Sequence, residues 1–341
     1  MLRALAALAV VLYHLGPHYQ HAGGSLNFLI VAAQWGFFGV DIFFVISGFV
    51  ISHTVFSRQR DLASAVTFLR HRLSRIFLGY WPFALLALYV LPLHSPENLV
   101  NVSTFDTLML TSADLHKLAV PVAWSLSYEL YFYGLFGLLY CGSNNVIKRV
   151  LLGIFLLLLV RTLFVKIDSD SNLYYWVSAY MLEFFYGVLI YLARELLSQR
   201  RLIVPALILI ITGLVAGVNH SLEHDTRVLY FGISAATIVV LALQLEANRL
   251  FVAPTWLVSL GDSSYALYLC HLFIITAFYQ YGWRDDLAAQ SPIVMEFGFL
   301  ALLAYIVFIA HFWYRRVERP LYLWAIGYKK ADPSATTPAA E

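Results

Sequence analysis

Four side chains that can gain or lose a proton interrupt otherwise apolar stretches of this sequence: His14, Asp41, Glu129 and His271. An ionisable group inside a bilayer carries a large free-energy cost, so each is treated first as a candidate functional group. Counting from the ends of the apolar stretches at ~1.5 Å per residue places all four near one depth, in the outer half of the bilayer. Carboxylates beside histidines can orient an imidazole and raise its basicity, so this set predicts a general base.

Arginines gather at the opposite, cytoplasmic level. Arg3 precedes His14 by eleven residues, which on a helix puts both on one face and about 16 Å apart. Arg72 and Arg75 lie with Arg70 at the inner end of the third apolar stretch. Guanidinium groups suit phosphates, so Arg3, Arg72 and Arg75 are candidates for binding the phosphates of a ligand. The alternative is that these arginines only fix the orientation of the chain in the membrane.

The elements that must position these groups are about ten apolar segments. The chain has 341 residues, 61% of them hydrophobic and 12% charged, whereas soluble domains average ~25% charged residues. The apolar blocks have the length that a helix needs to cross ~30 Å of hydrocarbon. They run near 2–18, 35–56, 74–93, 120–140, 148–166, 173–193, 202–218, 227–245, 257–281 and 293–315. The sequence therefore predicts an all-α, polytopic membrane protein with about ten transmembrane helices.

The charges in the connecting loops predict the orientation. With the N-terminus in the cytoplasm, the inner loops and the C-terminal region carry most of the arginines and lysines, and the outer loops carry mainly aspartate and glutamate. Basic residues are enriched on the cytoplasmic side of membrane proteins. Both termini are therefore expected to be cytoplasmic.

Other ionisable groups in these segments have structural explanations. Arg161 and Glu183 lie in adjacent segments and are expected to pair with each other. Asp262, followed by two serines, is expected to cap the ninth helix. Glu296 lies near the start of the last segment, where a carboxylate is stabilised by the helix dipole. A lone histidine in a membrane is also more often an interhelical hydrogen-bonding group than a catalyst.

Several short motifs occur together in an order and topology typical of one family. They are Arg3 to His14, Gly39 to Phe49 (GVDIFFVISGF), Arg70 to Ile76 leading to Tyr80, Trp124 to Glu129 (WSLSYE) followed by Phe132-Tyr133, Ser264 to His271 (SYALYLCH), and Glu318-Arg-Pro320. From Arg3 to Pro320 the chain thereby resembles the membrane-bound acyltransferase family 3. One departure is Leu78, which stands where the family usually has proline.

The resemblance implies transfer of a short acyl group, most often acetyl, from cytoplasmic acyl-coenzyme A to a hydroxyl of a cell-surface or lipid-linked sugar. It also implies a multi-pass protein of the bacterial inner (cytoplasmic) membrane. His14 is then the general base or a transient acyl carrier, and Trp124, Ser125 and Tyr268 are expected to contact the substrate. The expected partners are membrane lipid and a glycan acceptor, with no metal and no nucleic acid.

The predicted organisation is one transmembrane acyltransferase domain, residues 1–330, with a small, polar, disordered tail over 331–341. A transporter or flippase for a glycolipid or small polyol is the alternative, because helices with buried charges can also form a translocation path. The sequence leaves the acceptor sugar, the acyl chain and the oligomeric state open.

Overall fold

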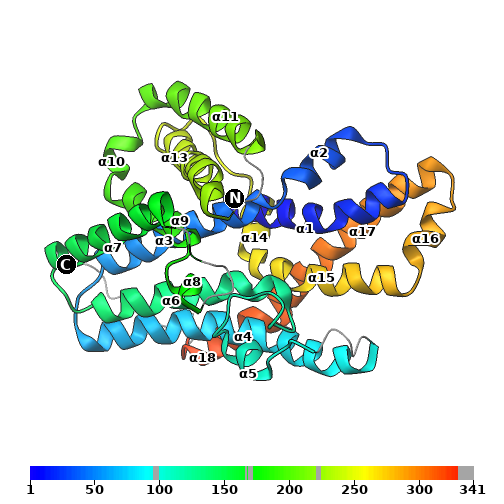
Figure 1. Ribbon diagram of the computed structural model, residues 1–341, viewed down its shortest axis with the longest axis horizontal. Helices are drawn as coiled ribbons and strands as arrows, with labels where there is room; N and C mark the ends of the chain where they lie inside the picture. The colour runs from blue at the N-terminus through cyan, green and yellow to red at the C-terminus, as the bar shows by residue number, and fades with distance from the viewer. Residues whose placement is uncertain (95–99, 166, 168–171, 220–223, 329–341) are drawn as a thin grey trace, which may run out of the picture.

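The computed structural model describes residues 1–94, 100–165, 167, 172–219 and 224–328, and within these ranges it contains helices and no strands (Figure 1). The tail predicted at 331–341 lies outside the described residues. The longer helices are α1 (Leu2–His21), α3 (Phe38–Phe56), α4 (Leu62–His94), α6 (Trp124–Leu139), α7 (Asn144–Phe164), α9 (Tyr180–Leu192), α11 (Ile203–Asn219), α13 (Ile233–Ala247), α15 (Ser264–Gln280) and α17 (Pro292–Trp313). Shorter helices connect them: α2 (Asn27–Trp35), α5 (Thr104–Met109), α8 (Asn172–Trp176), α10 (Arg194–Leu197), α12 (His224–Arg227), α14 (Thr255–Asp262), α16 (Trp283–Ala288) and α18 (Arg319–Ala325).

Six helical runs in the described chain are long and apolar enough to cross a membrane, and a seventh is gained if the bent pair α14–α15 counts as one span. The six are Phe38–Phe56, Leu62–Leu93, Tyr174–Leu192, Arg200–Gly217, Val228–Ala247 and Pro292–Ala325. The segments expected near 2–18, 120–140 and 148–166 are also helical, as α1, α6 and α7. The protein is therefore an all-helical, multi-pass membrane protein.

Helix α4 is longer than the apolar segment that predicted it. It begins at Leu62 rather than near residue 74. Its first turns bury Ala65 and Phe68, whereas Leu62 is exposed. Arg70 and Arg72 follow within the same helix, and these charges interrupt the apolar run on which the predicted boundary depended.

Helices α3 and α9 approach each other closely because each places a glycine at their contact. A Cβ added to Gly48 would lie 1.9 Å from the Phe184 carbonyl oxygen, and one added to Gly187 would lie 2.0 Å from the Val45 carbonyl oxygen. Small residues at helix contacts let backbones pack closely inside a membrane. This contact fixes the position of Asp41 on α3 relative to α9.

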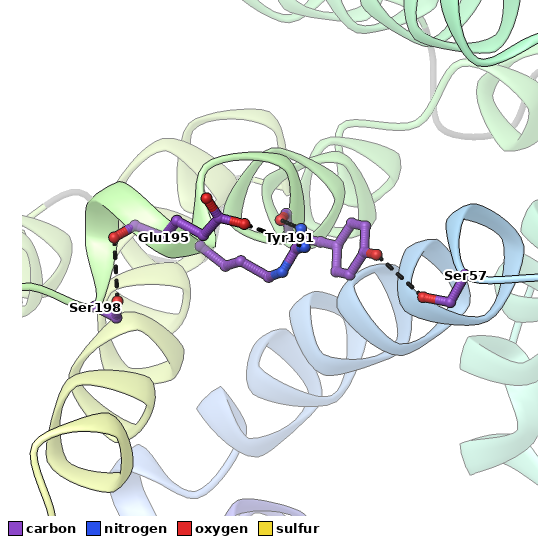
Figure 2. Close-up of polar contacts among 5 residues, drawn as sticks. Ser57, Tyr191, Glu195 and Ser198 are labelled. Atoms are coloured by element: carbon purple, nitrogen blue, oxygen red, sulfur yellow. Dashed lines mark hydrogen bonds and ion pairs between the residues drawn. The ribbon is translucent and has the colours of Figure 1, made fainter.

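The same two helices are joined again where they end (Figure 2). The hydroxyls of Ser57 and Tyr191 lie 3.3 Å apart. Arg194 donates to the Tyr191 carbonyl at 2.9 Å, and its guanidinium lies 4.4 Å from the centre of the Tyr191 ring. The contact ties the end of α3 to the turn that leads into α10.

Three local irregularities shape the region around the candidate site. The chain bends by 67° between α14 and α15, within the ninth expected segment. Wider π-helical turns occupy Val228–Gly232, before α13, and Tyr314–Glu318, between α17 and α18. Such turns are frequent at functional sites because they change the direction in which side chains point.

Candidate active site

His14 and His271 meet where α1 packs against α15. Their ring centroids are 5.1 Å apart, and His271 is completely buried. His271 Nδ1 lies 3.1 Å from the Leu267 carbonyl oxygen, one helical turn earlier. A carbonyl oxygen only accepts, so Nδ1 carries the proton and Nε2 keeps a lone pair. That Nε2 atom is buried without a hydrogen-bond partner, so the site holds an imidazole ready to accept a proton or a hydrogen bond.

A polar cavity of about 220 Å³ lies at the start of α1. Its charged lining comprises Arg3, Arg75 and Arg319, together with the carboxylates of Asp262 and Glu318. Three guanidiniums against two carboxylates leave an excess of positive charge. An anion that binds there finds several forked donors, the arrangement that suits phosphate.

A second, smaller cavity of about 40 Å³ continues inward from the first, with Arg3 lining both. Its polar residues include Ser125, Glu129 and Tyr268, and Phe43 contributes to its apolar wall. Arg3 donates to the Ser264 hydroxyl at 3.3 Å. Its guanidinium lies 5.8 Å from the Phe43 ring centre.

The small cavity leads toward the two histidines. The Tyr268 ring is 6.0 Å from the Phe43 ring and 6.1 Å from the His271 ring. Residues of α1, α3, α6 and α15 therefore form a continuous series from the arginine-lined cavity to the histidine pair. Figure 1 shows the N-terminal end of α1 near the middle of the molecule rather than at one end.

Arg72, predicted as a third phosphate ligand, is held differently from Arg3 and Arg75. It donates to the Thr54 hydroxyl at 2.9 Å and lies over the rings of Phe68 and Tyr133, at 5.7 and 5.6 Å from their centres. Arg319 lines the cavity instead. The motif Glu318-Arg-Pro320 marked this region in the sequence, but nothing in the motif indicated a ligand role.

Asp41 is engaged by Arg227, a residue that the sequence did not single out. Arg227 binds the fully buried Asp41 carboxylate through two nitrogen atoms, with its Nε 3.3 Å from Oδ1. Its guanidinium also lies 4.7 Å from the centre of the Phe37 ring. The carboxylate expected to orient His14 is therefore held in an ion pair, and its catalytic role stays a prediction.

Glu129 also has partners other than an imidazole. Its Oε1 accepts from the Ser47 hydroxyl at 3.0 Å and from the Tyr133 hydroxyl at 2.5 Å. Counting along the helix gave it the depth of His14, whereas the structure places it in the cavity with Arg3. Depth alone does not determine which way a side chain points, and that explains the difference.

The three predicted substrate-contact residues divide into two groups. The Tyr268 hydroxyl donates to the Val122 carbonyl at 2.7 Å and lies 2.9 Å from the Ser125 hydroxyl. Both side chains line the small cavity. Trp124 packs in an aromatic cluster, 5.0 Å from the Tyr180 ring and 5.9 Å from the Phe44 ring.

Three structural expectations for other charges were wrong. Arg161 pairs with Asp225 at 2.7 Å and not with Glu183, which is buried beside the Asp41–Arg227 pair. Asp262 ends α14 and lines the large cavity, and the residue before α15 makes no side-chain cap. Arg161 thus pairs with a residue farther along the chain than the expected one.

Glu296 ties the turn after α1 to α17 and does not act mainly through a helix dipole. It accepts from the Tyr19 hydroxyl at 2.5 Å. It also accepts from the backbone and side chain of Ser25 at 2.8 and 3.0 Å. The three hydrogen bonds contribute more free energy to the position of Glu296 than the modest contribution of the helix dipole.

The comparisons with known proteins agree with these motifs. The family model described as "Acyltransferase domain" (Acyl_transf_3) matches residues 1–313. The exopolysaccharide production protein ExoZ of Rhizobium meliloti (strain 1021) is 31% identical over 299 residues, which are 83% of this chain and 88% of ExoZ.

The O-acetyltransferase OatA of Staphylococcus aureus (strain NCTC 8325 / PS 47) is 24% identical over 360 residues, covering 94% of this chain. The match covers 56% of OatA, so this chain spans about half the length of that relative. No solved structure matches. The family model extends over most of the sequence, and the chain therefore belongs to the acyltransferase 3 family and is an acyltransferase enzyme of the membrane.

Proposed function

We propose that this enzyme transfers a short acyl group, acetyl in the first instance, from acyl-coenzyme A to a hydroxyl of a cell-surface or lipid-linked sugar. The names of the two relatives support this choice, since one is an exopolysaccharide production protein and the other an O-acetyltransferase. Membership of an acyltransferase family favours transfer over the alternative of transport.

The observation that carries the proposal is the His14–His271 pair. In the proposed reaction His14 removes the proton of the sugar hydroxyl as its oxygen attacks the thioester carbonyl. The new C–O ester bond forms, the C–S bond breaks, and the thiolate of coenzyme A takes the proton from His14. In the alternative scheme a His14 ring nitrogen attacks the thioester carbonyl, the C–S bond breaks and the coenzyme A thiolate leaves, which gives an acyl-imidazole. The sugar oxygen then attacks this acyl group, the N–acyl bond breaks, and the hydroxyl proton passes to the released His14 nitrogen.

His271 acts in this scheme as a positioning residue. Its Nδ1 proton is held by the Leu267 carbonyl, so Nε2 can only accept. At a centroid separation of 5.1 Å, a small rotation of either ring can place a His14 N–H on that atom. A hydrogen bond there fixes which His14 nitrogen faces the substrate.

The donor is proposed to bind with its phosphates in the arginine-lined cavity, on Arg3, Arg75 and Arg319. Its thioester arm would extend through the small cavity past Ser125 and Tyr268 toward the histidines. Arg3 and His14 are about 16 Å apart along α1. The thioester arm of the donor must therefore span about that distance in the proposed complex. The positive-inside pattern supports a cytoplasmic entrance to this cavity.

Release of free thiol from acetyl-coenzyme A tests this function. Membranes containing the enzyme and host surface glycans are expected to release thiol, and His14→Ala is expected to abolish release while inserting normally. Near-normal release by His14→Ala would contradict the assignment of His14. If the unaltered protein released no thiol with any acyl-coenzyme A or glycan, the proposed donor or acceptor would be wrong.

A further inference from the structure

Two exposed aromatic rings are stacked at the junction of α15 and α16. The rings of Tyr281 and Trp283 have centroids 5.5 Å apart at an interplanar angle of 30°. Tyr281 is 66% exposed and Trp283 is 55% exposed. Gly282 between them has φ +75°, a left-handed conformation that allows the sharp turn. The turn thus exposes two rings that stack on each other, and we call this pair the aromatic platform.

Charged residues that follow the aromatic platform in the sequence contact the neighbouring helices. Arg284 lies 4.5 Å from the centre of the Tyr279 ring and donates to Asp285 Oδ1 at 2.8 Å. The hydrogen bond from Arg284 lowers the pKa of the exposed Asp285 carboxyl, which therefore stays ionised at neutral pH. His21, at the end of α1, lies 3.8 Å from the same carboxylate oxygen. These contacts join α16, the helix that begins with Trp283, to both α15 and α1.

Ring contacts between α1 and α15 lead from the histidine pair toward the turn that carries the platform. Along the contact between α1 and α15, His14 faces His271 and His18 faces Tyr279, whose ring is 5.6 Å away. Positions 14, 18 and 21 share one face of a helix. The same face therefore leads from the candidate catalytic pair to the platform, and α16 lies at the end of the molecule where α1 turns into α2 (Figure 1).

We propose that the aromatic platform binds a sugar ring of the acceptor glycan, with the carboxylates of Asp285 and Asp286 accepting hydrogen bonds from its hydroxyls. This inference rests on the proposed function, because it assigns the outer acceptor site of the same enzyme. A pyranose has an apolar C–H face that stacks on flat rings and a rim of hydroxyls that donate to carboxylates. Rigid tyrosine and tryptophan rings supply contact area at little entropic cost.

The alternative occupant of exposed aromatic rings in a membrane protein is the lipid interface, where tryptophan and tyrosine are enriched. Two features favour the sugar. Asp285 and Asp286 are both exposed near the rings; Arg284 pairs with Asp285, and Asp286 leaves a net negative charge that would repel anionic headgroups. The contacts between α1 and α15 also lead from His14 to Tyr279, two residues before Tyr281.

Binding is measured without any acyl donor, so the result does not depend on acyl transfer. The purified full-length chain in phosphatidylcholine nanodiscs is titrated with chitohexaose and with cellohexaose, and saturation-transfer NMR reports the sugar protons in contact. Trp283→Ala is expected to weaken binding about 10-fold, the effect of losing one aromatic stacking contact. Trp283→Phe keeps a ring and is expected to weaken it less. The matched control is Trp324→Ala, an exposed tryptophan (78%) on α18, which is expected to bind like the unaltered protein.

The outcomes test glycan binding by the aromatic platform independently of the proposed acyl transfer. Loss of glycan binding confined to the Trp283 variants supports the platform, even if no acyl transfer is found with these sugars. Three results would overturn it: unchanged binding by Trp283→Ala, equal loss in Trp324→Ala, or no saturable binding of either hexasaccharide by the unaltered protein. Unchanged glycan binding together with reduced recovery of Trp283→Ala in the membrane fraction would identify Trp283 as an interfacial anchor.

Discussion

Arg227, directly before the π-helical turn, forms a buried ion pair with Asp41 on α3. Their side chains are 10% and 0% exposed. The pair therefore links α3 to the segment that enters α13, and it lies beside the aromatic ring of Phe37. Asp41 belongs to a family motif, whereas Arg227 does not, so the structure supplies the missing partner.

Replacing one member of this pair should lower the free energy of unfolding more than replacing both members. Asp41→Asn removes the carboxylate that Arg227 binds and leaves the neighbouring buried Glu183 as the counter-charge, so we expect a loss of about 3 kcal/mol in stability, the lower end of the range for a broken buried pair. The double variant Asp41→Asn, Arg227→Gln should recover most of that loss. Thermal unfolding in detergent gives the order of stabilities. A double variant less stable than Asp41→Asn alone would mean that the two side chains do not depend on each other.

Arg319→Ala should raise KM for acetyl-coenzyme A by about 10-fold or more, since a hydrogen bond to a charged group contributes ~1.5–3 kcal/mol. The value of kcat should change less. Steady-state thiol release at varied donor concentration measures both constants. Arg70→Ala is the matched control, because Arg70 is exposed and donates to the Ile326 carbonyl at 2.7 Å. Equal KM increases for the two variants would indicate a general electrostatic effect and not a site on Arg319.

His271→Phe should lower kcat by about 10²-fold and leave KM for the donor unchanged, because it removes the acceptor that orients His14. His271→Gln retains a side-chain acceptor and should recover part of the rate. A purely structural role for His271 would give parallel losses of protein stability and kcat in both variants. Thermal unfolding alongside the kinetics separates these cases.

Gly48→Ala should disrupt the contact of α3 with α9. The added methyl group would meet the Phe184 carbonyl at 1.9 Å, so the helices must separate, at a cost of about 1–3 kcal/mol or more. Gly134→Ala on α6 is the control, since a Cβ there meets nothing within 4 Å. Detergent unfolding temperatures compare the two. Equal stabilities would show that the helices can shift to accommodate the methyl group.

Much of the helical layout follows from hydropathy alone. Each of the ten apolar segments overlaps a helix, and six helical runs in the described chain are long and apolar enough to cross a membrane. The start of α4 was missed, since Arg70 and Arg72 interrupt the apolar run there. Counting residues along the helices predicted that His14 and His271 lie at the same depth of the bilayer. In the structure their rings are in contact.

The remaining site residues could not be placed in this way. Hydropathy gives depth along a helix but not rotation about its axis, so it could not distinguish Glu129 facing Arg3 from Glu129 facing His14. Arg227 ends the short helix α12 and belongs to no motif, and only the fold shows that it reaches Asp41. The same limit explains why Arg161 was assigned to Glu183 although it pairs with Asp225.

The π-helical turn at Tyr314–Glu318 sets the direction in which Arg319 points. A wider turn accommodates one more residue than an α-helical turn, and each residue of an α-helix advances the chain by about 100°. Deleting one residue within this turn would restore regular winding and rotate Arg319 away from the cavity while leaving the composition of the helix nearly unchanged. The cavity thus depends on the count of residues in one turn. Relatives that differ in length at this position are expected to differ in how they hold their donor, even where Glu318-Arg-Pro320 is intact.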